Sequence, residues 1–130
     1  MSSLSFNRGQ NKITLLDGKG NLLARWDAAN IVDSHAQQWQ NGTYNFSHLK
    51  SHTDDSPDSS YGAHGIAVFD TAVLNRTGLG VHSGRANTPD GLGRKGYLHA
   101  TFGCVRTSDE AMAKIVEVHR LDPLSTITLS

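Results

Sequence analysis

The chain has 130 residues, a length that supports one hydrophobic core and therefore a single domain over residues 1–130. Its 12 Lys and Arg residues balance 12 Asp and Glu residues, so no net charge steers it toward nucleic acid or an anionic membrane. No apolar run approaches the ~18 residues of a membrane-spanning helix. The single cysteine, Cys104, excludes an internal disulfide and a thiolate cluster for structural zinc.

Short segments with alternating or β-branched residues predict strands through most of the chain. Strands are expected at residues 13–16, 22–26, 41–46, 65–69, 78–82 and 125–129. The first two form a hairpin around the turn residues 17–21. Residues 47–65 and 83–98 are expected to be long loops, and loops of that length in a small domain often border a binding site.

One helix is predicted to begin near Thr107, because Thr107 and Glu110 have the spacing of a capping box. One helical face then carries Met112, Ile115, Val116 and His119. Pro123 prevents the helix from continuing beyond residue 122. With six or seven short strands and this helix in the C-terminal half, the chain is predicted to be mainly β, a small β-sandwich or barrel.

Cys104 is a candidate nucleophile, since several features around it favour a reactive thiolate. Arg106 lies two positions later, on the same face of an extended segment. The predicted helix points its N-terminal N–H groups back toward the sulfur, and Gly103 lets backbone N–H groups approach a substrate oxygen. His82 and His99 are the nearest candidates for the base.

This array of residues resembles the L,D-transpeptidase (YkuD-type) catalytic domain. The resemblance is carried by residues 81–84 (Val-His-Ser-Gly), 101–106 (Thr-Phe-Gly-Cys-Val-Arg), 109–111 and 126–128. It implies a mainly-β fold whose cysteine acylates on peptidoglycan stem peptides. His82 matches the family's histidine, Thr101, Gly103 and Cys104 match its Ser/Thr-His-Gly-Cys element, and Arg106 matches the residue two after the cysteine.

The sequence departs from the family pattern at Phe102, which stands where the family usually has a histidine. His82 is therefore the stronger base, and His99 is a substitute for the missing imidazole. The resemblance implies that the main-chain carbonyl of Ser83 orients the base. The candidate substrate contacts are Arg106, Thr101, Phe102 and Arg85, with Arg106 also suited to bind a carboxylate. Arg85 belongs to a basic loop with Arg94 and Lys95, which is either a solvated loop or a contact for an anionic stem peptide.

The implied reaction begins when the Cys104 thiolate attacks the carbonyl at the L-centre of a diamino acid in the donor tetrapeptide. The terminal D-alanine leaves with a proton from His82, and an amine or water resolves the thioester. An amine acceptor gives a cross-link or D-amino-acid exchange, and water gives L,D-carboxypeptidase trimming.

Other motifs carry less weight. A metal site is disfavoured because its candidate ligands, His48, His52, Asp54 and Asp55, lie in a Ser-rich loop without a rigid frame. Residues 91–96 have the letters of a dinucleotide fingerprint but follow no strand. No cofactor and no metal is therefore expected. Arg106 also has a simpler interpretation, as a surface cation near Asp109 and Glu110.

The N-terminal residues lack the features of a secretory signal. We therefore expect a protein made in the cytoplasm that acts on the cell wall after export by a signal-independent secretion route. Such an enzyme fits an antibacterial toxin, which would require an immunity protein in the producer. The alternative is a non-catalytic wall-binding or protein-interaction domain, which Phe102 favours.

Overall fold

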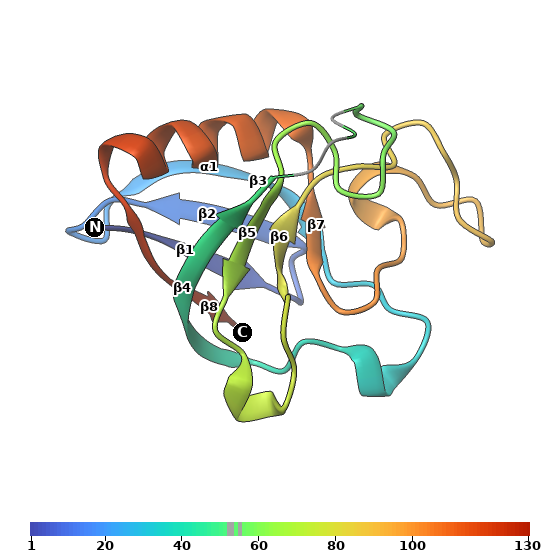
Figure 1. Cartoon of the computed structure of the whole chain (residues 1–130), viewed down its shortest axis with the longest axis horizontal. Helices are drawn as coiled ribbons and strands as arrows, with labels where there is room; N and C mark the ends of the chain where they lie inside the picture. The colour runs from blue at the N-terminus through green and yellow to red at the C-terminus, as the bar shows by residue number, and fades with distance from the viewer. Residues whose placement is uncertain (52–53, 55) are drawn as a thin grey trace.

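The computed structural model describes residues 1–51, 54 and 56–130, and within them eight strands close into a barrel in the order β1-β2-β3-β7-β6-β5-β4-β8 (Figure 1). The strands are β1 (Ser2–Asn7), β2 (Lys12–Leu16), β3 (Leu22–Ala29), β4 (Gly42–Lys50), β5 (Ile66–Phe69), β6 (Gly80–His82), β7 (Val105–Thr107) and β8 (Leu124–Leu129). The described part of the chain has one α-helix, α1 (Asp109–Leu121), and three short 3-10 helices, η1 (His35–Gln37), η2 (Ala72–Leu74) and η3 (Gly96–Leu98). No helix among these residues has the length and apolar character needed to cross a membrane. The prediction of a mainly-β fold with one helix is confirmed, and the architecture is the barrel.

The helix α1 lies across one side of the barrel (Figure 1) and contributes to the core. Its buried residues are Ala111, Met112, Ile115 and Val116. The Ser108 side chain caps the first turn by accepting a hydrogen bond from the Ala111 N–H at 3.1 Å. The predicted cap, Thr107, is instead the last residue of β7, and its hydroxyl donates to the Asp27 carbonyl at 2.7 Å. The helix therefore begins one residue later than a Thr107 cap requires.

The N-terminal strand β1 has no counterpart among the predicted strands. Leu4 and Phe6 point into the core, and three serines occupy positions between or before them. Serine does not favour strands by itself, so the alternation was not recognised. The strand forms because it pairs antiparallel with β2 and parallel with β8, which satisfies its backbone on both sides.

Strand β4 is also longer than predicted, because it extends to Lys50 into the expected loop 47–65. Its last residues pair with β5, with Leu49 opposite Ala67 and Lys50 opposite Ile66. His48 therefore lies in a strand. The polar sequence does not indicate this strand, because six of its nine residues are exposed.

The short strands β6 and β7 bring distant parts of the chain together. They pair in parallel, with Val81 opposite Val105 and His82 opposite Arg106. The loop after β4 and the loop after β6 are in contact at this end of the barrel, where the Arg85 N–H donates to the Ser59 carbonyl at 3.1 Å. The pairing thus places a histidine, an arginine and the adjoining Cys104 in one region.

Candidate active site

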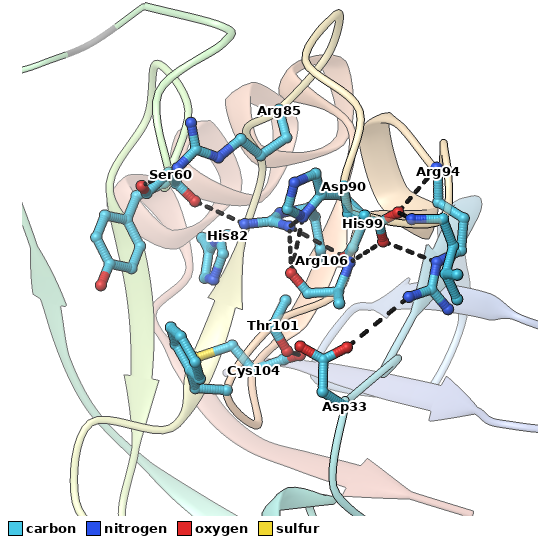
Figure 2. A pocket seen from close by; sticks show the side chains of 15 residues that line it. Asp33, Ser60, His82, Arg85, Asp90, Arg94, His99, Thr101, Cys104 and Arg106 are labelled. Carbon is cyan, nitrogen blue, oxygen red and sulfur yellow. Dashed lines mark hydrogen bonds and ion pairs between the residues drawn. The ribbon is translucent and has the colours of Figure 1, made fainter.

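The ends of β6 and β7 and the neighbouring loops enclose a pocket of about 500 Å³ (Figure 2). Of the predicted site residues, seven line it: His82, Arg85, His99, Thr101, Phe102, Cys104 and Arg106. Ser83 and Gly103 are the chain neighbours of His82 and Cys104. The tertiary structure therefore gathers the predicted residues in one place.

His82 is buried and held in a defined orientation. Its Nδ1 lies 2.7 Å from the Ser83 carbonyl oxygen. A carbonyl only accepts hydrogen bonds, so Nδ1 carries the hydrogen and Nε2 is the ring nitrogen with the lone pair in the neutral imidazole. The Tyr61 ring meets the imidazole edge to face at 5.0 Å between centroids. The structure thus shows the hydrogen bond to Ser83 that the family resemblance implied.

The surroundings of Cys104 disfavour its thiolate form. Burial raises the pKa of the thiol, and this effect outweighs the Gly80 N–H and the charges of Arg106 and Arg76, which act to lower it. The Sγ atom lies 3.7 Å from the Gly78 carbonyl oxygen, to which a thiol can donate. The direction is opposite to the expected lowering of the thiol pKa, and it favours a mechanism in which a base takes the thiol proton.

The N-terminus of α1 does not face the sulfur, contrary to expectation. Strand β7 separates Cys104 from the helix, and at roughly 3.3 Å per residue this distance exceeds the reach of a helix-terminal charge effect. The first helical residue, Asp109, instead accepts hydrogen bonds from the Ser83 hydroxyl and from the Ala63 N–H. Asp109 therefore supports the segment that orients His82.

Arg106 is a buried tie between three segments of the pocket wall (Figure 2). Its Nη2 donates to the Ser60 carbonyl at 2.8 Å, and its Nη1 donates to the carbonyls of His99 and Ala100 at 3.0 Å each. Its Nε points to the Ser83 carbonyl at 3.4 Å. With only 4% of the residue exposed, the interpretation as a surface cation is wrong. These bonds also leave no edge of the guanidinium with two available N–H groups, so bidentate carboxylate binding is not open to it.

Gly103 has a positive φ of 141°, which a residue with a Cβ rarely adopts. A Cβ there would lie 2.5 Å from Arg76 Nη2. The Gly103 N–H donates to Thr101 Oγ1 at 3.2 Å, and the Thr101 hydroxyl donates to the Cys104 carbonyl at 2.8 Å. The Thr101 hydroxyl and the Gly103 N–H therefore hold the loop around Cys104. Because the Gly103 N–H is hydrogen-bonded to Thr101, it is not available to bind a substrate oxygen in this conformation.

Asn30 is a residue that the sequence analysis missed. Its Nδ2 donates to the Gly103 carbonyl at 2.7 Å and to the Cys104 carbonyl at 3.0 Å, and its Oδ1 accepts from Arg8 at 2.7 Å. In a trans peptide the C=O and N–H point in opposite directions, so the Cys104 N–H points away from Asn30. This N–H is a better candidate for an oxyanion donor than that of Gly103. Asn30 belongs to no local motif, because it lies more than 70 positions before its partners.

Phe102 stands where the family usually has a histidine, and His99 is the expected substitute. The two residues have different surroundings. Phe102 is 82% exposed at the rim of the pocket. His99 lines the pocket wall, with Nδ1 at 2.8 Å from the Ala100 carbonyl oxygen and 3.0 Å from Arg106 Nη1. Nδ1 donates to the Ala100 carbonyl when it carries the hydrogen and accepts from Arg106 when it does not, so either tautomer has a hydrogen bond that restrains the ring. A role as a second base remains a prediction.

The candidate metal ligands do not form a cluster where the structure describes them. His48 lies in β4 and Asp54 in the loop after it, while His52 and Asp55 fall outside the described residues. No group of three His, Cys, Asp or Glu residues among those described is arranged to hold a metal ion. In residues 91–96, the Asp90 carboxylate accepts from the N–H groups of Leu92 and Arg94, so this loop is organised by its own aspartate.

Comparisons with known proteins give structural matches only. No family model and no curated protein matches the sequence. The fold is similar to an L,D-transpeptidase from Xylanimonas cellulosilytica, with a TM-score of 0.66 and 12% identity, and to one from Mycobacterium smegmatis, with a TM-score of 0.61 and 15% identity. Each match covers 99% of this chain but only 60% and 58% of the two structures. The chain therefore has the fold of L,D-transpeptidase domains and spans about three-fifths of the length of these two structures.

Proposed function

We propose that this protein, which has the fold of L,D-transpeptidase domains, catalyses cysteine-dependent acyl transfer on peptidoglycan stem peptides. The observation that carries the proposal is the His82 ring, which the Ser83 carbonyl fixes through Nδ1 in the pocket that also holds Cys104. This arrangement supplies a nucleophile, a base and a group that orients the base, which are the parts of a thiol acyl-transfer site.

The neutral thiol sets the order of the first steps. His82 Nε2 takes the proton from Cys104 Sγ as the sulfur attacks the carbonyl carbon at the L-centre of the diamino acid. The C=O electrons move to the oxygen, and the Cys104 N–H is the candidate donor that stabilises this oxyanion. When the oxyanion collapses, the C–N bond breaks and the leaving D-amino acid takes the proton from His82. A thioester between Cys104 and the stem peptide remains.

The second half-reaction repeats these steps with a new nucleophile. His82 removes a proton from an amine or from water, which attacks the thioester carbonyl, and the C–S bond breaks to return the Cys104 thiol. An amine gives a cross-link or an exchanged terminal residue. Water gives a shortened tripeptide. The identity of the acceptor therefore decides between transpeptidase and carboxypeptidase activity.

The experiment that tests the proposal is mass spectrometry of muropeptides after incubation with tetrapeptide-rich peptidoglycan. We expect the wild-type protein to remove or exchange the terminal D-alanine, or to form new cross-links, and Cys104→Ala to leave the substrate unchanged. Circular dichroism confirms that both proteins are folded. Unchanged muropeptides with the folded wild-type protein would refute an enzymatic role.

A non-catalytic wall-binding or interaction domain is the second candidate. It is favoured by the exposed Phe102 at the pocket rim and by the burial that raises the pKa of Cys104. Sedimentation with purified peptidoglycan distinguishes the two candidates. A binding module would sediment with the wall without altering it, and Phe102→Ala would reduce that binding while Cys104→Ala would not.

We also propose that the activity serves as an antibacterial toxin that acts on the wall after export and is neutralised in the producer by an immunity protein. The proposal is motivated by the substrate class, because trimming or exchange removes the tetrapeptide donors that a growing wall uses. Periplasm-directed expression should arrest growth or cause lysis, and Cys104→Ala should be harmless. Harmless expression of the active enzyme in the periplasm would count against this role.

A further inference from the structure

Two of the three arginines that line the pocket have no carboxylate partner. Arg94 is paired, with Nε 2.7 Å from Asp90 Oδ2 and Nη2 4.0 Å from Asp33 Oδ1. Among the described residues, neither Arg85 nor Arg106 forms an ion pair. The two aspartates of the pocket wall thus pair with Arg94, and no carboxylate among the described residues pairs with the other two arginines.

Arg85 and Arg106 converge on one residue, Ser60 (Figure 2). Arg85 Nη2 donates to Ser60 Oγ at 2.7 Å, and Arg106 Nη2 donates to the Ser60 carbonyl at 2.8 Å. Burial, together with the nearby charge of Arg85, lowers the pKa of Arg106 to about 10. Two guanidinium groups that share a neighbour in a partly desolvated pocket repel one another, and an anion between or beside them relieves that repulsion.

The two arginines differ in what they can offer such an anion. Arg106 donates its N–H groups to the carbonyls of the pocket wall, so it contributes positive charge to an anion site rather than direct hydrogen bonds. Arg85 is half-buried, and its side chain makes two hydrogen bonds to described residues, to Ser60 Oγ and, at 3.4 Å, to the Asp58 carbonyl. A guanidinium has five N–H groups, so Arg85 retains donors for a ligand.

We propose that Arg85 and Arg106 form an anion subsite that binds a free carboxylate of the substrate, with Arg85 as the contacting residue. The identity of that substrate rests on the function proposed above. A stem tetrapeptide carries a carboxylate on its C-terminal residue and, where the diamino acid is diaminopimelate, another on that side chain. The subsite makes the enzyme selective for peptides that present such a carboxylate in the pocket that also holds Cys104.

The first test uses two alkylating reagents and does not depend on turnover. Iodoacetate and iodoacetamide both form an S–C bond with the Cys104 thiolate and release iodide, and they differ in the negative charge of iodoacetate. Both reagents react with the same thiolate, so the ratio of their rate constants does not depend on how much of the thiol is ionised. The ratio therefore reports the electrostatic field beside the sulfur. We expect this ratio to exceed that of an unstructured cysteine peptide.

The variants then assign the carboxylate contact to Arg85. Arg85→Gln should lower the iodoacetate-to-iodoacetamide ratio several-fold, because it removes the group that contacts the iodoacetate carboxylate, while Arg106 and Arg76, the charges that act on the Cys104 thiol itself, stay in place. Arg85→Lys should retain most of the ratio. Lys95→Gln is the matched control, because it removes the same charge from an exposed position of the same loop outside the pocket lining. A wild-type ratio no higher than that of the cysteine peptide, or an equal fall in Lys95→Gln, would overturn the subsite even if Arg85→Gln does not fold.

The second test identifies the source of the carboxylate. kcat/KM is measured for a diaminopimelate tetrapeptide, for its C-terminal amide, and for the analogue with lysine as the diamino acid. A fall with the amide assigns the terminal carboxylate, a fall with lysine assigns the side-chain carboxylate, and either fall should disappear in Arg85→Gln. Equal values for all three peptides would overturn the inference. No turnover of any peptide, with the alkylation ratio still dependent on Arg85, would instead refute the proposed function and leave the anion subsite standing.

Discussion

The two sides of the barrel are stabilised in different ways. On one side, β1 and β2 pair at five register positions, and their inward residues fill the core. On the other side, β6 and β7 pair at only two positions, and β7 pairs with β3 at two. On this short side, Val81 and Val105 also belong to the core, and polar side chains that bind backbone carbonyls add to the few backbone pairs.

Arg106 and Asn30 show what replaces the missing backbone pairing. Arg106 donates to carbonyls of the segments that contain Ser60, Ser83 and His99, and Asn30 donates to the carbonyls of Gly103 and Cys104. A side chain can hold a loop in an orientation that regular strand pairing does not allow. The candidate site therefore lies where the sheet is shortest, and the side chains that hold this region also orient its reactive groups.

The largest effect on stability is expected on the long side of the barrel. Phe6 is fully buried in the core, so Phe6→Ala should lower the free energy of unfolding by about 3–5 kcal/mol through lost contacts and a cavity. Urea unfolding measures this loss. The native fraction should keep the wild-type ratio of iodoacetate to iodoacetamide reactivity at Cys104, since the pocket is held by other groups. A loss below about 1 kcal/mol would contradict the assignment of the core.

A smaller stability loss with a larger functional effect is expected on the short side. Asn30→Asp keeps the shape but removes both N–H donors to the carbonyls of Gly103 and Cys104. The free energy of unfolding should fall by about 1–3 kcal/mol, and kcat should fall about 10–100-fold with little change in KM. Asn41→Asp is the control, because Asn41 is exposed and contacts Arg8 but not the Cys104 loop. Equal kcat values for the two variants would refute a positioning role for Asn30.

The pH dependence of Cys104 sharpens the same comparison. Because burial raises the pKa of the thiol, alkylation by iodoacetamide should increase about tenfold per pH unit at neutral pH and level off at a higher pH than in the urea-unfolded chain. The linked effect on stability has a definite sign. The unfolded chain releases this proton at lower pH, so the free energy of unfolding should decrease as pH rises above the ordinary thiol pKa. A midpoint below that of the unfolded chain would show instead that the native site stabilises the thiolate.

The smallest effect is expected at an exposed ion pair on the long side. Lys12 and Asp27 pair across β2 and β3, with 42% and 53% of their side chains exposed. Because solvent screens such pairs, a double-mutant cycle with Lys12→Ala and Asp27→Ala should give a coupling energy below about 1 kcal/mol. A larger coupling would mean that polar contacts stabilise the long side as well, which would remove the contrast between the two sides.

Much of the fold was predictable because its signals are local. The hairpin over residues 12–26 follows from alternation around a turn, in which Asp17 accepts from the N–H groups of Lys19 and Asn21. The buried face of α1 follows from the helical spacing of Met112, Ile115 and Val116. Strand β1 and the end of β4 were missed because their pairing partners, and not their own residues, make them strands.

The candidate site divides in the same way. The sequence by itself was enough to single out the candidate residues, since Cys104, His82 and the nearby Gly103 and Arg106 stand in a recognisable order along the chain. Only the tertiary structure decided that Arg106 is a buried tie, that Asn30 holds the Cys104 loop, and that burial raises the pKa of the thiol. Desolvation and hydrogen bonding depend on atoms that are far apart in the chain, and the parallel pairing of β6 with β7 brings those atoms together.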